Sequence, residues 1–379
     1  MEGWTYCVPC LMGIEGLAAE ELRELGCENV RAENGRVLFA GGAELLARVN
    51  LGSWFGERVL LLLGEFPARS FEELFQGVRA LPWEALLGKE DAFPVSGSSL
   101  SSQLHSVPDC QAIIKKAIVE RLKGKYRLSW FPETGPLHRV RFRILKDKVS
   151  LMVDTSGEGL HKRGYRRESN LAPMKETLAA ALCKLARVRP DGNFIDPFCG
   201  SGTLLIEAAL LAGNIAPGLR RSFQAESWRD ADPQVWRRER ERAQDLERRD
   251  ITFTATGYDI DPAAAALTLE NAQKAGVAAW VRAWVRDIRD FREEGPYGCV
   301  VCNPPYGERL LDGEEARRLI QVMGQVFQPR RGWSYGVITP EPEFEKLYGR
   351  RADKRRKLYN GMIPCQFYQY FKAETGARR

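Results

Sequence analysis

Histidine and long apolar runs are scarce in this sequence. Only three histidines occur among 379 residues, which argues against a metal site or a catalytic triad built on histidine. The longest purely aliphatic run, residues 59–63, is far shorter than the about 20 residues that span a bilayer. The first residues also lack the positively charged segment and apolar core of a signal peptide. We therefore expect a cytoplasmic protein without membrane contact.

Cysteine occurs nine times, but in no pattern that favours a metal. Only Cys7 and Cys10 have CxxC spacing, and no second pair completes a zinc site. We expect ordinary buried thiols and no bound metal. With 44% hydrophobic and 28% charged residues the composition is that of a globular protein. The net charge of +6 favours an anionic partner such as nucleic acid only weakly.

The N-terminal half has the pattern of two small α+β units, residues 1–51 and residues 52–155. In the first unit an amphipathic helix precedes a hairpin expected at Asn34-Gly35, a strong turn signal. In the second, two alternating strands flank Lys146-Asp147, and a helix within residues 108–126 has one apolar and one basic face. The basic face and the serine-rich loop before it suit a phosphate backbone, although a merely solvated face has the same composition.

After about residue 160 the pattern changes to alternating strands and helices, typical of a doubly wound, mostly parallel α/β sheet. Five strands are expected, in the segments "NFIDPF", "FTATGYDI", "WVRAWVRDI", "GCVVCNPPY" and "WSYGVIT". In such sheets ligands bind outside the carboxyl ends of the strands. The residues that end these strands are therefore the candidates for a functional site.

The first of these strands ends at Asp196 and is followed by a glycine-rich turn, residues 199–202, that opens onto a helix from Thr203. Glycines let the backbone approach a ligand, and a helix start offers unpaired N–H groups. NAD is disfavoured because Leu205 stands where the third glycine of G-x-G-x-x-G would fall. A carboxylate before the turn suits a cationic amine better than a pyrophosphate.

Acidic residues also follow the next two strands. Asp259 can accept hydrogen bonds from both ribose hydroxyls, and Asp287 can accept from an adenine amine. An amino acid head, a ribose and an adenine without phosphate describe S-adenosylmethionine. For any single aspartate a role as turn or helix-capping residue stays open, but three in this order favour the cofactor.

The segment "VVCNPPY" ends the fourth strand on an amide. The Asn303 side-chain oxygen and the Pro304 carbonyl can accept the two hydrogens of a base amine and so turn its lone pair toward a methyl donor. Pro304 and Pro305 fix the backbone without adding an N–H, and Tyr306 can stack on the base. The pattern predicts methylation of an amine on a planar ring without naming the base. Asn-Pro-Pro is also a good strand terminator.

More residues separate Asp196 from Asp259 than a helical crossover needs. The surplus, within residues 214–250, contains a helix that is rich in tryptophan and arginine. We expect either an exposed helix with many ion pairs or a contact with substrate.

Several segments together resemble the RNA guanine-N2 methyltransferases that carry a THUMP domain, in particular the bacterial large-subunit rRNA enzymes of L type. They are "DPFCGSGTLLIEAALLAGNIAPGL", "GYDIDP", "NPPYGERL", "DTSGEGLHKRGYR", "APMKETLAAAL" and "KLYNGMIPCQFYQY". The resemblance covers essentially the whole chain. It implies a ferredoxin-like unit over residues 1–51, a THUMP domain over 52–155 and a Rossmann-like class I methyltransferase domain over 156–379.

The resemblance also implies site residues. Asn303, Pro304, Pro305 and Tyr306 would hold the target guanine. Residues 159–166 and 173–176 would line the cofactor and substrate cleft, and the basic stretches 161–167 and 350–357 would contact phosphates. The implied residues for S-adenosylmethionine are Asp196, Pro197, Phe198, Cys199, Gly200, Ser201, Gly202, Thr203, Asp259, Ile260, Asp287 and Ile288.

The implied partner is RNA, with 23S rRNA favoured and tRNA as the alternative. The substrate would be naked RNA or an assembling ribosomal particle. A two-enzyme fusion known in this family is longer than the present chain. Two other functions stay open from the residues alone. One is an adenine-N6 or cytosine-N4 methyltransferase of nucleic acid, and the other is a non-catalytic RNA-binding assembly factor.

Overall fold

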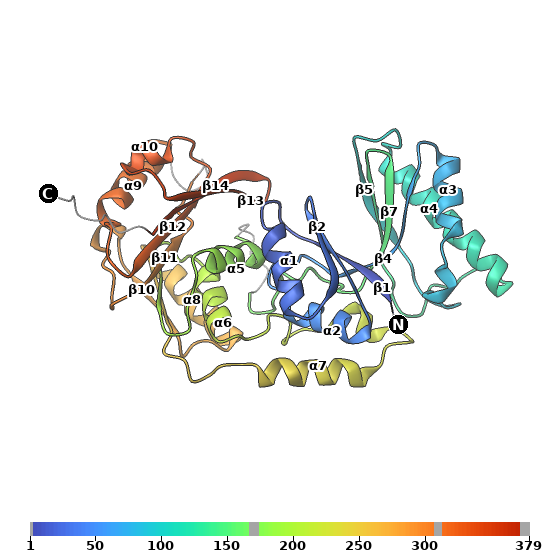
Figure 1. The fold of residues 1–379 in the computed structure, drawn as a ribbon, viewed down its shortest axis with the longest axis horizontal. Coiled ribbons are helices and arrows are strands. Elements are labelled where there is room, and N and C mark those ends of the chain that lie inside the picture. Colours follow the sequence, from blue (N-terminus) through green and yellow to red (C-terminus); the bar gives the residue numbers. More distant parts are fainter. Residues whose placement is uncertain (1–2, 167–173, 307–312, 372–379) are drawn as a thin grey trace.

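The computed structural model describes residues 3–166, 174–306 and 313–371. The chain forms an elongated molecule with one seven-stranded sheet toward each end (Figure 1). One large apolar core extends through both parts, since it contains Phe39 and Phe142 as well as Leu178 and Leu205. In the three described ranges, no helix is both long and apolar enough to cross a membrane.

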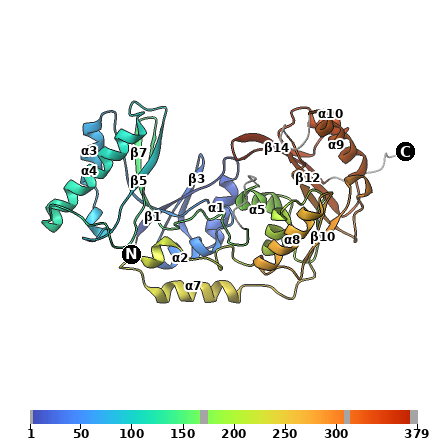
Figure 2. The same ribbon diagram turned by 180° about the vertical axis from the view of Figure 1, so that it is seen from behind.

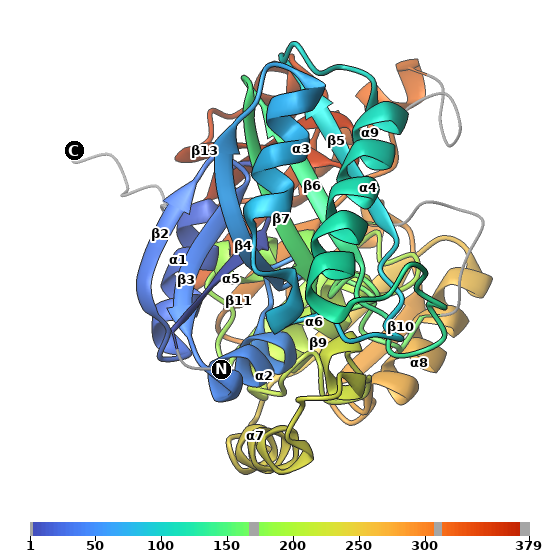
Figure 3. The same ribbon diagram turned by 90° about the vertical axis from the view of Figure 1, so that its right-hand side faces the viewer.

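The N-terminal sheet has the strand order β2-β3-β1-β4-β7-β6-β5. Strand β4 pairs with β1 on one side and with β7 on the other, so the two predicted α+β units share one continuous sheet. Helices α3 and α4 lie side by side over the strands of the second unit (Figure 3). The strands are β1 (Trp4–Pro9), β2 (Glu28–Glu33), β3 (Arg36–Gly41), β4 (Leu60–Pro67), β5 (Val95–Leu100), β6 (Val140–Leu145) and β7 (Lys148–Asp154). The helices are α1 (Glu15–Glu24), α2 (Ala43–Gly52), α3 (Phe71–Ala80), the 3₁₀ turn η1 (Trp83–Ala85) and α4 (Val107–Tyr126).

Both predicted hairpins are confirmed. Glu33 pairs with Arg36 across the turn at Asn34-Gly35, where Gly35 has φ +72°. Lys146 and Asp147 both adopt left-handed φ values, 51° and 61°, as a two-residue turn between twisted strands requires. Local turn chemistry therefore sets these registers.

The C-terminal sheet has the order β10-β9-β8-β11-β12-β14-β13. The first five strands in this order run parallel, and β14 is antiparallel to both β12 and β13. The predicted doubly wound fold is confirmed. The strands are β8 (Asn193–Asp196), β9 (Thr254–Asp259), β10 (Val281–Val285), β11 (Gly298–Cys302), β12 (Trp333–Thr339), β13 (Lys354–Asn360) and β14 (Ile363–Tyr370). The helices are α5 (Glu176–Leu185), α6 (Thr203–Ala212), η2 (Gln224–Ser227), α7 (Pro233–Asp245), α8 (Pro262–Ala275), η3 (Ile288–Asp290), α9 (Gly313–Val326) and α10 (Phe344–Tyr348).

Helix α7 is the tryptophan- and arginine-rich helix expected in the surplus segment. It runs along α2 of the N-terminal unit, beneath the main body of the molecule (Figures 1 and 2). Arg48 donates two hydrogen bonds to Glu239, at 2.8 and 2.7 Å, and Trp236 stacks on Phe223. The expectation of an exposed helix with ion pairs is confirmed for its outer face, where Arg237 pairs with Glu241. It is wrong for the inner face, which joins the two parts of the chain.

Candidate active site at the carboxyl edge of the second sheet

The predicted site residues follow strands that end at one edge of the C-terminal sheet. Asp196 is in register with Gly257, and Asp259 is in register with Val285. The strand order reverses between β8 and β11, and ligands of open α/β sheets bind at such a switch point. The structure thus brings the ends of β8, β9 and β11 together at this edge.

The turn after β8 uses backbone conformations that favour glycine. Gly200 and Gly202 have φ values of +51° and +80°. A Cβ atom at Gly202 would lie 2.8 Å from the Cγ2 atom of Thr268, whereas nothing lies within 4 Å of a Cβ atom at Gly200. The Gly200 N–H donates to Oδ2 of Asp259 at 3.0 Å. The turn is therefore fixed on its inner side and open at its tip.

Asp196 is a buried carboxyl group without a cationic partner among the described residues. Its side chain is 2% exposed, and Oδ1 accepts a hydrogen bond from the Phe198 N–H at 3.1 Å. Burial, with a smaller contribution from the charge of Asp259, raises the pKa of Asp196 to about 8. A buried carboxylate of this kind is stabilised by a cation. The ammonium group of S-adenosylmethionine meets that requirement, so the residues present fit the predicted cofactor.

Asp259 and Asp287 accept hydrogen bonds from backbone N–H groups of nearby turns, and both side chains are partly exposed. Asp259 accepts from the Asp261 N–H as well as from Gly200, and Asp287 accepts from the Arg289 N–H at 2.8 Å. Both aspartates therefore do act as turn or helix-capping residues, which was the alternative to a role in cofactor binding. Beside them Ile260 is 72% exposed, while Ile288 is packed in the core. Of the predicted cofactor residues, the buried ones are Asp196, Pro197, Cys199, Gly202, Thr203 and Ile288, and the partly or fully exposed ones are Phe198, Gly200, Ser201, Asp259, Ile260 and Asp287.

Asn303 follows β11 directly and carries an unsatisfied polar atom. Its Oδ1 is buried, and no residue in the described ranges donates a hydrogen bond to it. Such orphaned acceptors are rare in proteins, and a catalytic role is one explanation for them. Pro304 is buried, and Pro305 and Tyr306 are half-buried beside it. Residues 307–312 of the "NPPYGERL" segment lie outside the described residues.

Tyr306 is anchored by a residue that sequence reasoning did not assign to the site. The Asn360 Nδ2 donates to the Tyr306 Oη at 2.7 Å. Burial raises the pKa of Tyr306 to about 12, so its phenol stays neutral at physiological pH. Asn360 belongs to β13, in the "KLYNGM" segment that the sequence had singled out only through the family resemblance.

Arg166 and Glu176 meet at the start of α6. The Arg166 guanidinium forms an ion pair with Glu176 at 2.8 Å, and its Nη1 donates to the Thr203 Oγ1 at 3.1 Å. Arg166 and Glu176, at the ends of the segments 159–166 and 174–176, therefore lie beside the predicted cofactor turn. Pro173 lies outside the described residues. The resemblance placed Arg166 in a segment that lines the cofactor and substrate cleft, but it assigned Arg166 no contact of its own.

The prediction that residues 161–167 contact phosphates is wrong for Arg163. Its side chain is buried and donates to the carbonyl oxygens of Leu160 and Trp54, both at 2.8 Å. The Oε2 atom of Glu207 lies 3.5 Å from the Nη2 atom of Arg163. A guanidinium has five N–H donors, and here buried acceptors use several of them. Arg167 lies outside the described residues.

The basic stretch 350–357 is split between structural and exposed side chains. Arg350 lies over the Tyr370 ring, 4.6 Å from its centroid, and the Arg356 Nη1 donates to the Gly13 carbonyl at 3.0 Å. Lys354 and Lys357 are exposed on β13, the edge strand of the sheet. Only the exposed members of this stretch stay candidates for phosphate contact.

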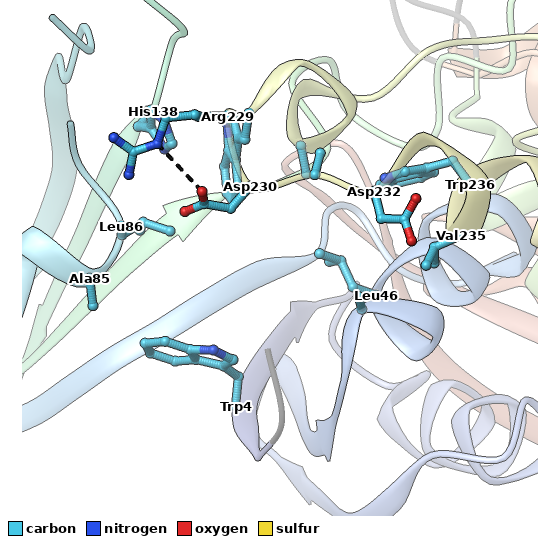
Figure 4. A pocket seen from close by; sticks show the side chains of 14 residues that line it. Trp4, Leu46, Ala85, Leu86, His138, Arg229, Asp230, Asp232, Val235 and Trp236 are labelled. Carbon is cyan, nitrogen blue, oxygen red and sulfur yellow. Dashed lines mark hydrogen bonds and ion pairs between the residues drawn. The ribbon is translucent and has the colours of Figure 1, made fainter.

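A separate cavity lies at the joint between the two parts of the chain (Figure 4). It is lined by Trp4, Leu86, His138, Asp232 and Trp236 among others, and none of the predicted site residues belongs to it. His138 is buried and stacks on Trp228, and burial lowers its pKa to about 4. The described part of the chain contains no cluster of metal-ligating side chains. All nine cysteines are buried free thiols, as the sequence predicts.

Comparison with known proteins identifies all three parts. Family models match residues 5–60 as an RlmL ferredoxin-like domain, residues 68–154 as a THUMP domain and residues 163–369 as an RMKL-like methyltransferase domain. The Bacillus subtilis (strain 168) protein named "Putative RNA methyltransferase YpsC" is 42% identical over 382 residues, covering 100% of this chain and 99% of that protein.

Longer relatives are named "Ribosomal RNA large subunit methyltransferase K/L". The one from Pseudomonas aeruginosa is 34% identical over 97% of this chain but only 54% of its own length. The present chain thus spans about half the length of these relatives.

Solved structures match over nearly the whole chain. SMU.472, titled a "putative methyltransferase complexed with SAH", has a TM-score of 0.93 and 41% identity, with 98% of both chains covered. A Listeria monocytogenes protein titled a "predicted N6-adenine-specific DNA methylase" has a TM-score of 0.92 and 45% identity, with 98% of this chain and 97% of that chain covered. Together with the family model over residues 163–369, these matches confirm the resemblance: the chain belongs to the RMKL-like family of S-adenosylmethionine-dependent methyltransferases.

Proposed function

We propose that the protein methylates the exocyclic N2 amine of a guanine in RNA, and that this RNA is the 23S rRNA of the large ribosomal subunit. The observation that carries the proposal is the buried Oδ1 of Asn303, directly after β11, to which no described residue donates a hydrogen bond. The THUMP match and the names of the K/L relatives support RNA and the large subunit as the substrate class. The family resemblance of the motifs supports guanine N2.

The amine of a base is a poor nucleophile because its lone pair is delocalised into the ring. Asn303 Oδ1 and the Pro304 carbonyl accept its two hydrogens and orient the lone pair away from the ring plane. Tyr306, neutral and held by Asn360, stacks on the base. Catalysis then rests on positioning and on stabilising positive charge at the amine, without a strong general base.

S-adenosylmethionine, when bound, supplies an electrophilic methyl group on a sulfonium. In the proposed arrangement Asp196 binds its ammonium group, and the Asp196–Thr203 turn, with Arg166 beside Thr203, surrounds its amino acid head. Asp259 and Ile260 face the ribose, and Asp287 and Ile288 face the adenine. These roles follow from strand order and from the buried carboxyl group of Asp196, which has no cationic partner among the described residues.

The proposal also assigns RNA binding and methyl transfer to different parts of the chain. Residues 1–51 and 52–155, the ferredoxin-like and THUMP units, hold the RNA, and residues 156–379 carry out the transfer. Because β4 joins the first two units in one sheet and α7 ties that sheet to the catalytic part, the RNA grip is held at a fixed place relative to Asn303. The cytoplasm, where ribosomal RNA is made and assembled in bacteria, is the proposed location, and tRNA is the alternative substrate.

The test is transfer of labelled methyl groups from S-adenosylmethionine to separated rRNA and tRNA from a strain that lacks the gene, followed by nucleoside analysis. N2-methylguanosine in large-subunit rRNA is the expected product. The same nucleoside in tRNA would change the partner and keep the chemistry. N6-methyladenosine, or no transfer to either RNA, would overturn the proposal.

The Asn303→Ala variant tests the mechanism in the same assay. Removing one of the two acceptors of the amine is expected to lower kcat by about 100-fold or more. Cofactor affinity is the internal control, because Asn303 is not among the residues proposed to hold S-adenosylmethionine. Full activity of this variant would contradict the proposed role of Asn303.

A further inference from the structure

The turn between β13 and β14 projects beyond the edge on which the site is built. Gln366 of β14 pairs with Thr339, the last residue of β12, and Asn360 pairs with Ile363 across the hairpin. Residues 363–365 and the Gly361-Met362 turn therefore continue past the carboxyl end of the parallel strands. Asn303 lies at this same edge, after Cys302, whose partner on β12 is Val337.

This hairpin is held on two sides. The Asn360 Nδ2 bonds to the Tyr306 Oη at 2.7 Å, which places the turn directly beside the proposed base-binding motif. On the other side the Arg356 Nη1 donates to the Gly13 carbonyl at 3.0 Å, and a Cβ atom at Gly13 would lie 2.5 Å from the Lys357 oxygen. The N-terminal unit thus packs closely against β13. A turn held on both sides keeps its position when it contacts a bound molecule.

The tip of the hairpin is apolar although it stands in solvent. Met362 is 94% exposed, more than any other large apolar side chain in the described ranges, and the adjacent Ile363 is 45% exposed. On the stem of the hairpin, Lys354 and Lys357 are exposed as well. An apolar tip on a cationic stem is the combination that nucleic-acid-binding proteins use when a side chain enters a base stack beside a contacted backbone.

We propose that the β13–β14 turn is a wedge, in which Met362 enters the RNA base stack at the place that the target base leaves. This inference rests on the proposed function, because it assumes an RNA base bound at Asn303. A base in a stacked or paired stretch reaches Asn303 only after it leaves the stack, and that step costs energy. Met362 offsets the cost by replacing the lost stacking contacts, while Lys354 and Lys357 lie near the phosphates.

The wedge matters only where the target base is stacked, which gives a direct test. Methyl transfer is measured on folded large-subunit rRNA from a strain lacking the gene, and on the same RNA after fragmentation and heat denaturation. We expect Met362→Ala to lower kcat/KM on folded RNA by about tenfold or more, and on the fragments by less than about twofold. Met362→Leu, which keeps an apolar tip, is expected to retain activity on both.

Leu246→Ala is the matched control, since Leu246 is a 49% exposed apolar residue at the end of α7 and is expected to leave both activities unchanged. Equal losses on folded and fragmented RNA, or no loss on either, would overturn the wedge and leave the proposed function standing. If the wild-type protein transfers no methyl group to either form of RNA, the proposed function fails, and the wedge fails with it.

Discussion

The Nη1 atom of Arg166 lies 3.1 Å from the Oγ1 atom of Thr203, and the same guanidinium pairs with Glu176 at 2.8 Å. Thr203 is the first residue of α6, directly after the glycine turn. A positive charge and the free N–H groups of a helix start thus converge beside the proposed amino acid head of the cofactor. Asp196, on the other side of the turn, supplies the opposite charge.

Arg166→Ala is predicted to weaken binding of S-adenosylmethionine by about 10- to 100-fold. The reason is the loss of one charge-assisted hydrogen bond to the cofactor carboxylate, worth about 1.5–3 kcal/mol. Isothermal titration calorimetry measures the effect. Methylthioadenosine, which lacks the amino acid head, is expected to bind the variant and the wild type equally well. Arg189→Ala is the control, because Arg189 pairs with Asp191 on the exposed surface. An equal loss for both ligands would contradict a contact with the carboxylate.

Asp196→Asn is predicted to change how the stability of the ligand-free protein depends on pH. The folded-state pKa of about 8 lies above the ordinary value of 3.8, so between these values the folded protein keeps a proton that the unfolded chain has released. The wild type therefore loses stability as pH rises from about 4 to about 8. The amide cannot ionise, so the variant does not lose this stability. The melting temperature of the variant minus that of the wild type is expected to increase from pH 5 to pH 8.

Thermal unfolding without and with S-adenosylmethionine checks this prediction. At pH 8 the cofactor is expected to raise the melting temperature of the wild type and to have little effect on the Asn variant. Asp191→Asn is the control, because an exposed ion pair with Arg189 lowers the pKa of Asp191. The melting temperature of this variant is therefore expected to differ from that of the wild type by a constant amount above pH 5. A constant difference between Asp196→Asn and wild type across this range would show that Asp196 is ionised throughout.

The strand ends at Asp196, Asp259 and Asn303 could be predicted because the signals for them are local. Apolar runs mark buried strands, and Gly, Pro and Asp mark where they stop. The doubly wound sheet follows from the alternation of strands and helices, and both hairpins follow from their turn residues. In each case the residues that decide the structure are neighbours in the chain.

The contacts that complete the site could not be predicted in this way. Arg166 is 37 residues from Thr203, Tyr306 is 54 residues from Asn360, and Arg48 is 191 residues from Glu239. No periodicity or spacing indicates such pairs, because packing of whole elements brings them together. Arg163 illustrates the converse, since a basic run suggested phosphate contact while its guanidinium is buried among carbonyl oxygens. Composition does not distinguish a surface cation from one that serves the core.

Glu239→Ala is predicted to destabilise the protein by about 1–3 kcal/mol, the range for charged hydrogen bonds in partly buried positions. The Glu239 side chain is 7% exposed, and its loss leaves Arg48 without its bidentate partner between α7 and α2. Chemical denaturation measures the change. Glu241→Ala on the same helix is the matched control, because its pair with Arg237 is exposed and is expected to contribute little. Equal effects of the two substitutions would mean that the α7 joint adds nothing to stability.

Gly202→Ala is predicted to cost more stability than Gly349→Ala, although the two glycines have nearly the same φ, +80° and +81°. Both substitutions force an L residue into the left-handed region, at about 1–2 kcal/mol. At Gly202 the new Cβ would also lie 2.8 Å from Thr268 Cγ2, whereas Gly349 has nothing within 4 Å. The overlap adds on the order of 1–3 kcal/mol.

Unfolding measurements on both variants separate the two contributions, and cofactor titration reports the consequence for the site. Because relief of the overlap would displace the turn that faces Asp196 and Asp259, Gly202→Ala is expected to lose cofactor affinity and Gly349→Ala to keep it. Unchanged affinity in Gly202→Ala would place the cofactor away from this turn.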